Sequence, residues 1–224
     1  MKKIFALAGV LVALCTSGQD CKNYYFLQNN KTVEMTIYNK KGGSEAKLVY
    51  LISEVKNSGN ATMATVQSEM FDKKGKSISK GSSVMKCNGG IMMINMKLNL
   101  PQQQTEQFTK ANVKIEDVYM EYPTAMKTGD QLKDGNLSMD MDNSGMKQSL
   151  TMTISDRKVE GEEKITTAAG TWDCYKISFK NKMIFKIMGA GIPMNMDGTE
   201  WYAPGFGVVK SQNKHGITEI TSVK

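Results

Sequence analysis

The 224-residue chain has only one histidine, the commonest catalytic base, and only one arginine, the usual phosphate ligand. The histidine, His215, lies between Lys214 and Gly216 in a segment typical of a hairpin turn, where a base would be exposed to water. Nucleophilic catalysis by serine or cysteine needs such a base, so we expect His215 to be an ordinary turn residue. The single arginine, Arg157, argues against arginine-based phosphate recognition.

The sequence also lacks the motifs of metal and nucleotide sites. Zinc needs clustered cysteine and histidine ligands, and the few present are scattered. No phosphate-binding glycine loop or dinucleotide fingerprint occurs. The segment Asp140–Gly145 resembles the start of a calcium loop, but Thr151 stands at the twelfth position, where a bidentate glutamate is required. We therefore expect no cofactor, no catalytic residues and a non-enzymatic protein.

The charge is basic but dispersed. The chain has 29 basic and 22 acidic residues, a net charge of +7, and its lysines are spread through turn segments. Nucleic-acid-binding proteins concentrate lysine and arginine in one patch or stripe. We therefore expect no nucleic-acid partner.

The first 18 residues have the layout of a secretory signal. Lys2 and Lys3 precede an uncharged apolar run that ends at Leu14, and small residues follow up to Gly18. A run this short cannot span a bilayer, which needs about 20 apolar residues. We predict cleavage after Gly18, one β-rich domain over residues 19–224, and a periplasmic, secreted or outer-surface location. The mature chain is not expected to span a membrane.

A lipid anchor is not expected. Lipoprotein processing needs a small residue directly before the modified cysteine, whereas Cys15 follows Leu14 and Cys21 follows Asp20.

The mature chain keeps three cysteines in an oxidising compartment, which indicates one disulfide and one free thiol. All three pairings of Cys21, Cys87 and Cys174 are possible, and three unpaired cysteines are the alternative. We favour Cys21 with Cys87, because this bond would hold an N-terminal tail that otherwise frays.

A period of two in hydrophobicity runs through most of the mature chain and is typical of strands with one buried face. It predicts an all-β fold, an antiparallel meander curled into a barrel or half-barrel, with few helices. One short helix is expected at Gln102–Ala111. The alternating segments are Val33–Tyr38, Lys47–Val55, Thr62–Phe71, Met92–Leu100, Leu137–Met141, Met146–Ile154, Trp172–Phe179, Met183–Met188, Val208–Ser211 and Ile217–Val223.

Three turn segments share one pattern, namely Asn39–Gly42, Asp72–Gly75 and Asn213–Gly216. The Asn or Asp side chain can accept a hydrogen bond that starts the turn, and the glycine can adopt the left-handed conformation that closes the hairpin. Each segment therefore predicts a hairpin tip.

Methionine is abundant, with 18 residues in the chain. Thioether sulfur binds Cu(I), and the pairs Met139 with Met141 and Met194 with Met196 would each share a strand face. The second interpretation is that methionines line an interior, where flexible side chains adapt to an irregular core or an apolar ligand. The candidate ligand-lining residues are Met92, Ile94, Met96, Leu98, Leu150 and Met152.

The segments Glu160–Ile177 and Glu200–Lys210 resemble the TapB family of exported bacterial proteins, as do Gln19–Cys21, the Asn-Lys-Lys-Gly turn and Lys86–Gly89. The resemblance covers nearly the whole mature chain. It implies a single β-rich, barrel-like domain outside the cytoplasm with no assigned catalytic residues. Trp201, Tyr202 and Phe206 would pack at one end of the barrel or rim an opening into it, and they complete the set of candidate ligand-lining residues.

These observations predict a non-enzymatic envelope protein that binds an apolar or amphipathic small molecule, a lipid, or a protein partner. The alternatives are a methionine-based Cu(I)-binding protein, a structural envelope component, and an enzyme whose site is built from ordinary polar residues. The oligomeric state is open.

Overall fold

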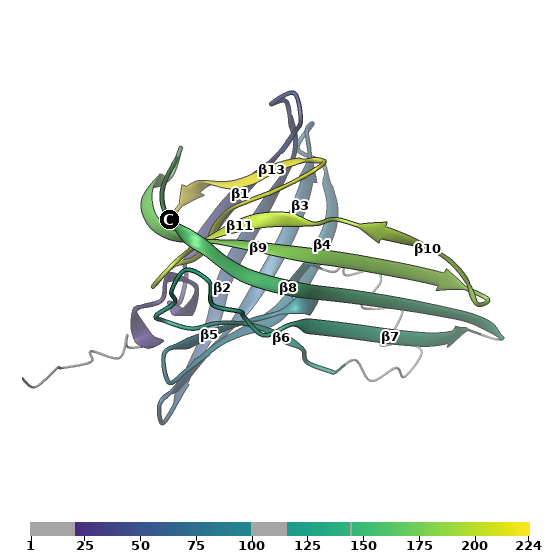
Figure 1. The fold of residues 1–224 in the computed structure, drawn as a ribbon, viewed down its shortest axis with the longest axis horizontal. Coiled ribbons are helices and arrows are strands. Elements are labelled where there is room, and N and C mark those ends of the chain that lie inside the picture. The colour runs from purple at the N-terminus through teal and green to yellow at the C-terminus, as the bar shows by residue number, and fades with distance from the viewer. Residues whose placement is uncertain (1–20, 100–115, 144) are drawn as a thin grey trace, which may run out of the picture.

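The computed structural model describes residues 21–99, 116–143 and 145–224, and these form one antiparallel sheet of thirteen strands. Hydrogen-bonded neighbours follow the order β6-β5-β4-β3-β2-β1-β13-β12-β11-β9-β8-β7, with β10 paired to β9. Strands β1 and β13, the first and last along the chain, pair with each other in the middle of this order. The sheet curls into a nearly closed barrel (Figure 1), and the predicted meander is confirmed. The strands are β1 (Thr32–Asn39), β2 (Ser44–Ser58), β3 (Ala61–Asp72), β4 (Ser77–Asn88), β5 (Ile91–Asn95), β6 (Tyr119–Tyr122), β7 (Gly135–Asn143), β8 (Met146–Thr167), β9 (Gly170–Ile187), β10 (Ala190–Asn195), β11 (Gly198–Ala203), β12 (Gly207–Asn213) and β13 (Gly216–Val223).

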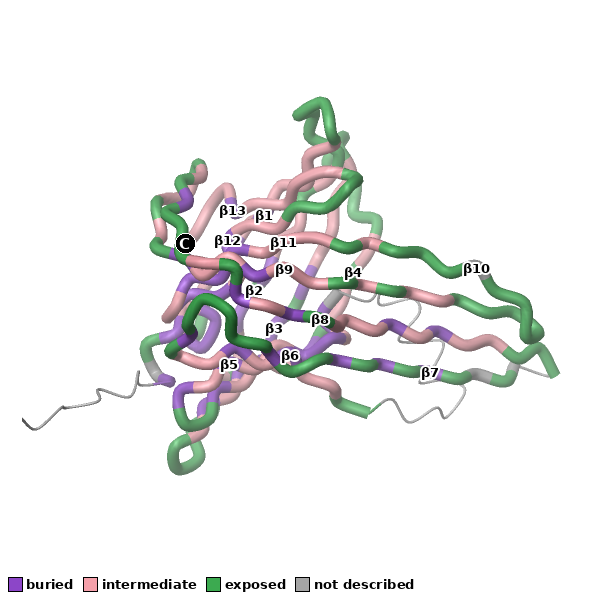
Figure 2. Tube along the Cα trace, viewed as in Figure 1, coloured by how far each residue is buried: buried purple, intermediate pink, exposed green. Residues whose placement is uncertain are grey.

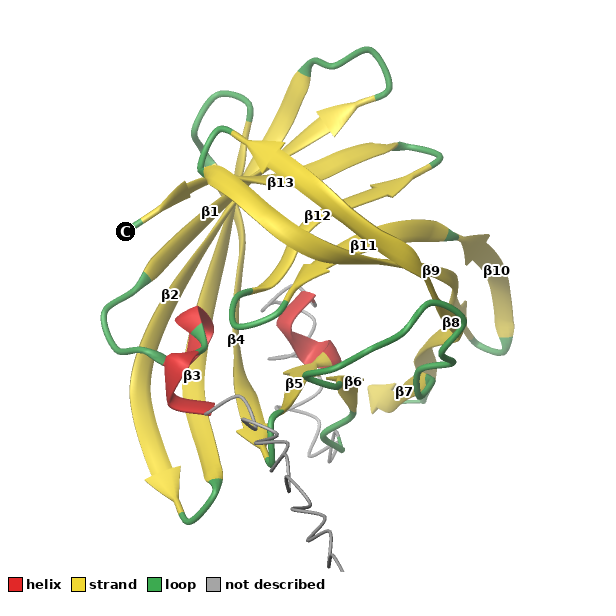
Figure 3. Cartoon of the chain, turned by 60° about the vertical axis from the view of Figure 1, so that its left-hand side comes forward, coloured by secondary structure: helices red, strands yellow, loops and turns green. Residues whose placement is uncertain are grey.

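Helical structure in the described residues is limited to three single turns of 3-10 helix. The turns η1 (Cys21–Asn23) and η2 (Tyr25–Leu27) precede the barrel, and η3 (Met96–Asn99) follows β5. In Figure 3, η1 and η2 lie against the inner side of the sheet near β2 and β3. The expected helix at Gln102–Ala111 lies outside the described residues.

The hairpin tips form by the expected side-chain hydrogen bonds. Asn39 Oδ1 accepts from the Lys41 and Gly43 amides, and Asp72 Oδ1 accepts from the amides of Lys74 and Lys76. The glycines of both turns are left-handed, at φ of 78° and 80°. The third tip differs: Asn213 accepts in the same way, but Gly216 is needed because a Cβ there would collide with the Tyr38 carbonyl.

The predicted strand Met92–Leu100 is wrong beyond Asn95. Asn95 Oδ1 accepts a hydrogen bond from the Lys97 amide at 2.9 Å, which bends the backbone out of the strand and starts η3. Met96 and Leu98 stay buried although they follow the strand. Leu100 lies outside the described residues.

Strands β7 to β10 extend beyond the rest of the barrel as an arm (Figure 1). The alternating segments Trp172–Phe179 and Met183–Met188 are joined in the single strand β9, apart from Met188, which lies in the turn after it. Burial falls towards the end of the arm (Figure 2), and large apolar side chains are exposed there. They are Met146, Phe185, Ile187, Met188 and Met194.

A β-bulge in β8 changes which residues face the interior. Leu150 and Met152 are buried, but the pairing with β9 shifts between Ser155 and Lys158, and Asp156 has a φ of 52°. The one extra residue turns Asp156 out to solvent and Arg157 inward. Asp156 Oδ2 is held on the outside by Lys180 Nζ at 2.8 Å.

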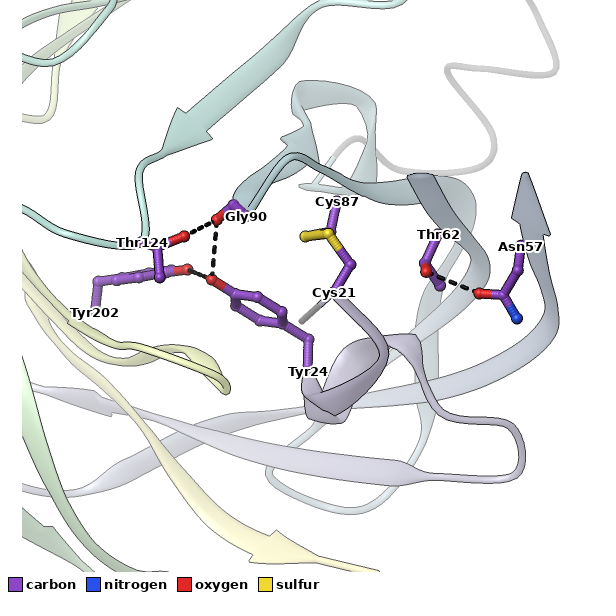
Figure 4. Close-up of a disulfide and its surroundings, with 8 residues drawn as sticks. All are labelled: Cys21, Tyr24, Asn57, Thr62, Cys87, Gly90, Thr124 and Tyr202. Atoms are coloured by element: carbon purple, nitrogen blue, oxygen red, sulfur yellow. Dashed lines mark hydrogen bonds between the residues drawn. A yellow bond between two sulfur atoms is a disulfide. The ribbon is translucent and has the colours of Figure 1, made fainter. Parts of the chain in front are cut away.

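A disulfide joins Cys21 to Cys87, the pairing that the sequence favoured, and Cys174 is free and buried. The bond ties η1 to the end of β4 (Figure 4). Tyr24, three residues after Cys21, is fully buried beside it. The disulfide therefore fixes the N-terminal turns against the barrel.

Replacing both cysteines, Cys21→Ser and Cys87→Ser, is expected to lower the free energy of unfolding by about 4 kcal/mol, because the bond closes a long loop in the unfolded chain. The sequence separation is 66 residues. Urea unfolding followed by tryptophan fluorescence measures the difference. A double variant as stable as the native protein would show that the bond does not constrain the chain.

Candidate functional site: the barrel interior

The barrel contains an open cavity of about 400 Å³. Its apolar wall comes mainly from β1 to β6 and includes five methionines: Met35, Met70, Met85, Met92 and Met120. Other apolar side chains on this wall are Ile37, Leu48, Tyr50, Ile94 and Leu98. Alternate residues of these strands point inward, so the hydrophobic period of two becomes the surface of the cavity.

The opposite wall, from β9 to β13, is partly polar. Asn181, Glu200, Ser211 and Thr218 line it, and Glu200 is the only charged residue among the described lining residues. Glu200 pairs with Ser211, and Ser211 pairs with Thr218, so these three residues form one row across β11, β12 and β13. We call this set the Glu200 row.

Glu200 is held by Arg157, the only arginine of the chain, which is fully buried. Arg157 Nη2 lies 3.5 Å from Glu200 Oε1, and the guanidinium lies 4.6 Å from the centre of the Tyr122 ring. The Tyr122 hydroxyl donates to the same Glu200 oxygen at 3.0 Å. The carboxylate therefore receives two donors through a single oxygen.

Arg157 also closes the barrel. Strands β6 and β7 are the two ends of the strand order and do not pair with each other. Arg157 Nη1 donates to the carbonyl of Glu121 in β6 at 3.1 Å and to that of Lys133, two residues before β7, at 3.0 Å. A Lys133–Glu121 ion pair of 2.7 Å adds a second link between the same segments.

A chain of tyrosines connects this seam to the disulfide. Tyr122 stacks on Tyr202 with ring centres 4.6 Å apart and planes inclined by 9°. The Tyr202 hydroxyl donates to that of Tyr24 at 3.3 Å, and Tyr24 donates to the Gly90 carbonyl at 3.5 Å (Figure 4). Thr124 also donates to Gly90, so the turn between β4 and β5 is held from both sides.

Burial sets the protonation behaviour of this interior. It raises the pKa of the Glu200 carboxyl above its usual range, an effect that Arg157 and the Tyr122 hydrogen bond oppose. Burial also raises the pKa of Tyr122 and of Tyr202. The tyrosines therefore stay neutral and keep their protons for hydrogen bonding.

One end of the cavity is filled by aromatic side chains. Phe26 of η2 lines the cavity and packs edge-on against Tyr50 and Phe206, with ring centres 5.9 and 5.7 Å apart. Phe206 also stacks on Tyr25 at 5.1 Å and contacts Trp172 at 5.5 Å. The N-terminal turns, once fixed by the disulfide, thus close this end.

The candidate ligand-lining residues divide into two groups. Met92, Ile94 and Leu98 line the cavity. The other six are buried core residues that are not among the described lining residues: Met96, Leu150, Met152, Trp201, Tyr202 and Phe206. Trp201 donates through Nε1 to Glu163 at 2.7 Å, and Tyr202 belongs to the tyrosine chain described above.

The two predicted copper pairs lie in different parts of the sheet, Met139 with Met141 on β7 and Met194 with Met196 at β10. Met139 is buried on β7, Met194 is about half exposed on β10, and Met196 follows the end of β10. Strands β8 and β9 lie between β7 and β10. The side chain of Met141 lies outside the described residues. In the described part of the chain, no group of three His, Cys, Asp or Glu side chains could hold a metal ion.

His215 lies exposed at the β12–β13 tip, as the sequence indicated. The residues that sequence reasoning missed are Glu200, Tyr122 and the inward Arg157, since no local motif marks them. One sequence signal was available. Arg157 follows the polar residues Ser155 and Asp156 and precedes Val159, at the point where the apolar alternation of β8 shifts by one position.

A search of the described residues for an apolar helix of bilayer-spanning length finds none.

Comparisons with known proteins agree with this architecture. A family model described as DUF3108-like matches residues 28–223. A proposed exported protein of Bacteroides fragilis with a YmcC-like fold is 20% identical, with a TM-score of 0.69 over 90% of this chain and 98% of that one. A proposed lipoprotein of Parabacteroides distasonis is also 20% identical, with a TM-score of 0.68 over 92% of this chain and 100% of that one. Among curated proteins, none matches the sequence.

Arg157→Met is expected to destabilise the protein by about 3–5 kcal/mol, because it removes the link between β6 and β7 and leaves Glu200 buried without a counter-ion. Lys158→Met is the matched control: its side chain is 44% exposed, and the loss should stay below about 1 kcal/mol. Urea unfolding of both variants makes the comparison. Equal stability of the two would contradict the bridging role of Arg157.

The Cys174 thiol is expected to be inert in the folded protein at pH 8. Burial raises its pKa to about 12, with smaller effects from Asp173 and Glu163, so almost no thiolate is present. Ellman's reagent should react with Cys174 only after urea unfolding, when the pKa returns to about 8.5. Fast reaction without urea would contradict the buried position.

Proposed function

The chain belongs to the DUF3108-like family, and we propose that it is an exported protein that binds an apolar or amphipathic small molecule inside its barrel. The observation that carries this proposal is the cavity of about 400 Å³ with a largely apolar wall. Ligand pockets usually have volumes of about 300–1,000 Å³ and combine apolar walls with a few polar groups.

The methionines support a binding role over simple packing. Five of them line the cavity, and unbranched thioether side chains can rearrange around ligands of different shape. A well-packed core would leave few voids larger than a water molecule, whereas this cavity has the volume of more than about ten water molecules.

The location outside the cytoplasm is part of the proposal. The sequence of residues 1–18 supports a cleaved export signal, and the two similar structures belong to proteins described as exported or as a lipoprotein. The absence of a lipid anchor stays a prediction for this chain. It is supported by Cys21, whose sulfur is used in the disulfide with Cys87.

We also propose that the chain is related to the TapB proteins. The residues of that resemblance have structural uses that support it. Trp201 bonds to Glu163, and the turn Ala203–Gly207 carries Phe206 into the aromatic end of the barrel.

Leu48→Trp is expected to weaken binding of the apolar fluorescent probe N-phenyl-1-naphthylamine by about tenfold, a loss of about 1.4 kcal/mol. Leu48 lines the cavity, and the larger ring would occupy part of it. A fluorescence titration of the purified native protein and the variant measures both affinities.

Leu51→Trp is the matched control. It makes the same substitution three residues along β2, on the outer face, where the side chain is 42% exposed. Probe binding should be unchanged there, and thermal unfolding checks that both variants fold. If the native protein does not bind the probe, or both variants lose it equally, the cavity is not the binding site.

A further inference from the structure

The polar side of the cavity has an unusual charge distribution. Among the described lining residues there is no lysine, arginine or histidine, and the only charged group is Glu200. The Glu200 charge is already matched by Arg157, which lies behind it in the barrel wall. The cavity surface therefore offers hydrogen-bond acceptors and hydroxyls, but no cation for an anionic ligand.

One oxygen of Glu200 remains available. Oε1 accepts from Tyr122 and Arg157, while Oε2 has no hydrogen-bond partner in the described part of the chain. The Glu200 side chain is 13% exposed and lines the cavity, so the accessible part of the carboxylate faces that space. Oε2 is not one of the fully buried polar atoms without a partner, so it can be reached from the cavity, and a ligand hydroxyl can donate a hydrogen bond to it.

Two hydroxyl side chains extend this acceptor into a row. Ser211 lies opposite Glu200 in the β11–β12 pairing, and Thr218 lies opposite Ser211 in the β12–β13 pairing. Directly paired side chains are about 4.5–5.5 Å apart at Cβ, so a head group with neighbouring hydroxyls can contact two members of the row at once.

We propose that the Glu200 row is the subsite for the uncharged, hydroxyl-bearing head of a single-chain amphiphile, with monoacylglycerol as the representative class. The acyl chain lies along the methionine wall formed by Met35, Met70, Met85, Met92 and Met120. This inference rests on the proposed function, because it assigns the ligand of the same cavity.

Other head groups fit less well. A carboxylate or phosphate would face Glu200 without a cation on the described cavity surface, and like charges at close range repel. An ammonium group would compete with Arg157 for the Glu200 carboxylate, which is already paired, and the ammonium would lose its hydration on entering the cavity. A neutral donor leaves the Arg157–Glu200 pair as it is.

The test compares three ligands of equal chain length: 1-decanoylglycerol, decanoate and decylammonium. Each displaces N-phenyl-1-naphthylamine from the protein purified after export, which is expected to begin at Gln19. We expect 1-decanoylglycerol to bind about tenfold or more tightly than either charged ligand. Decanoate or decylammonium binding as tightly as 1-decanoylglycerol overturns the inference.

Glu200→Gln is the diagnostic variant. Its amide oxygen can take the place of Oε1, and its NH₂ group then presents a donor to the cavity where the native protein presents an acceptor. The preference for 1-decanoylglycerol over decanoate should fall to about twofold or reverse. An unchanged preference in a folded variant overturns the role of Glu200.

Ser211→Ala keeps the test decisive if Glu200→Gln fails to fold. It should weaken the binding of 1-decanoylglycerol by about three- to tenfold and leave the binding of decanoate unchanged. The control is Gln212→Ala at the neighbouring, exposed position of β12, and it should change the affinity for neither ligand. Equal effects of the two variants overturn the inference.

The native protein also separates failure of the subsite from failure of the proposed function. If decanoate, decylammonium and 1-decanoylglycerol all displace the probe equally, the proposed function stands and only the subsite is wrong. If the native protein binds no probe, both are wrong.

Discussion

The architecture depends on how one buried guanidinium closes an antiparallel sheet. Strands β6 and β7 end the strand order without pairing, and Arg157 joins their segments through the carbonyls of Glu121 and Lys133. A guanidinium suits this role because it presents several donors in a fixed plane and stays charged. Its charge needs a counter-ion inside the barrel, since an unpaired buried charge is very unfavourable. Glu200 is that counter-ion.

This closure also shapes the proposed binding site. The carboxylate that balances Arg157 must lie in the barrel interior, and its second oxygen is then left at the cavity surface. Tyr122 bonds to the same carboxylate and stacks on Tyr202, which carries the network to Tyr24 beside the Cys21–Cys87 bond. The seam, the polar side of the cavity and the N-terminal turns are therefore parts of one buried network, in which low dielectric strengthens each hydrogen bond.

The sequence predicts much of the fold because alternation, turn chemistry and export context are local signals. Asn39 and Asp72 begin turns through bonds to their own neighbours, and these turns are present. The site is different because it depends on long-range pairing. Glu200 looks like any polar strand residue, and only its register with Ser211 and Thr218 places it on the cavity. Arg157 points inward because of a bulge, and a one-residue change in a strand reverses the face of every later side chain. Likewise, the strand predicted from Met92 ends at Asn95 because one side-chain hydrogen bond outweighs the alternation.

A crystal structure of the native protein grown with 1-decanoylglycerol tests most directly whether the cavity behind the Arg157 seam holds an amphiphile with its head at Glu200. We expect a decanoyl chain against the methionine wall and a glycerol hydroxyl at about 2.5–3.0 Å from Glu200 Oε2. A cavity that holds only water, or a ligand bound instead to the exposed apolar side chains of the β7–β10 arm, would contradict it.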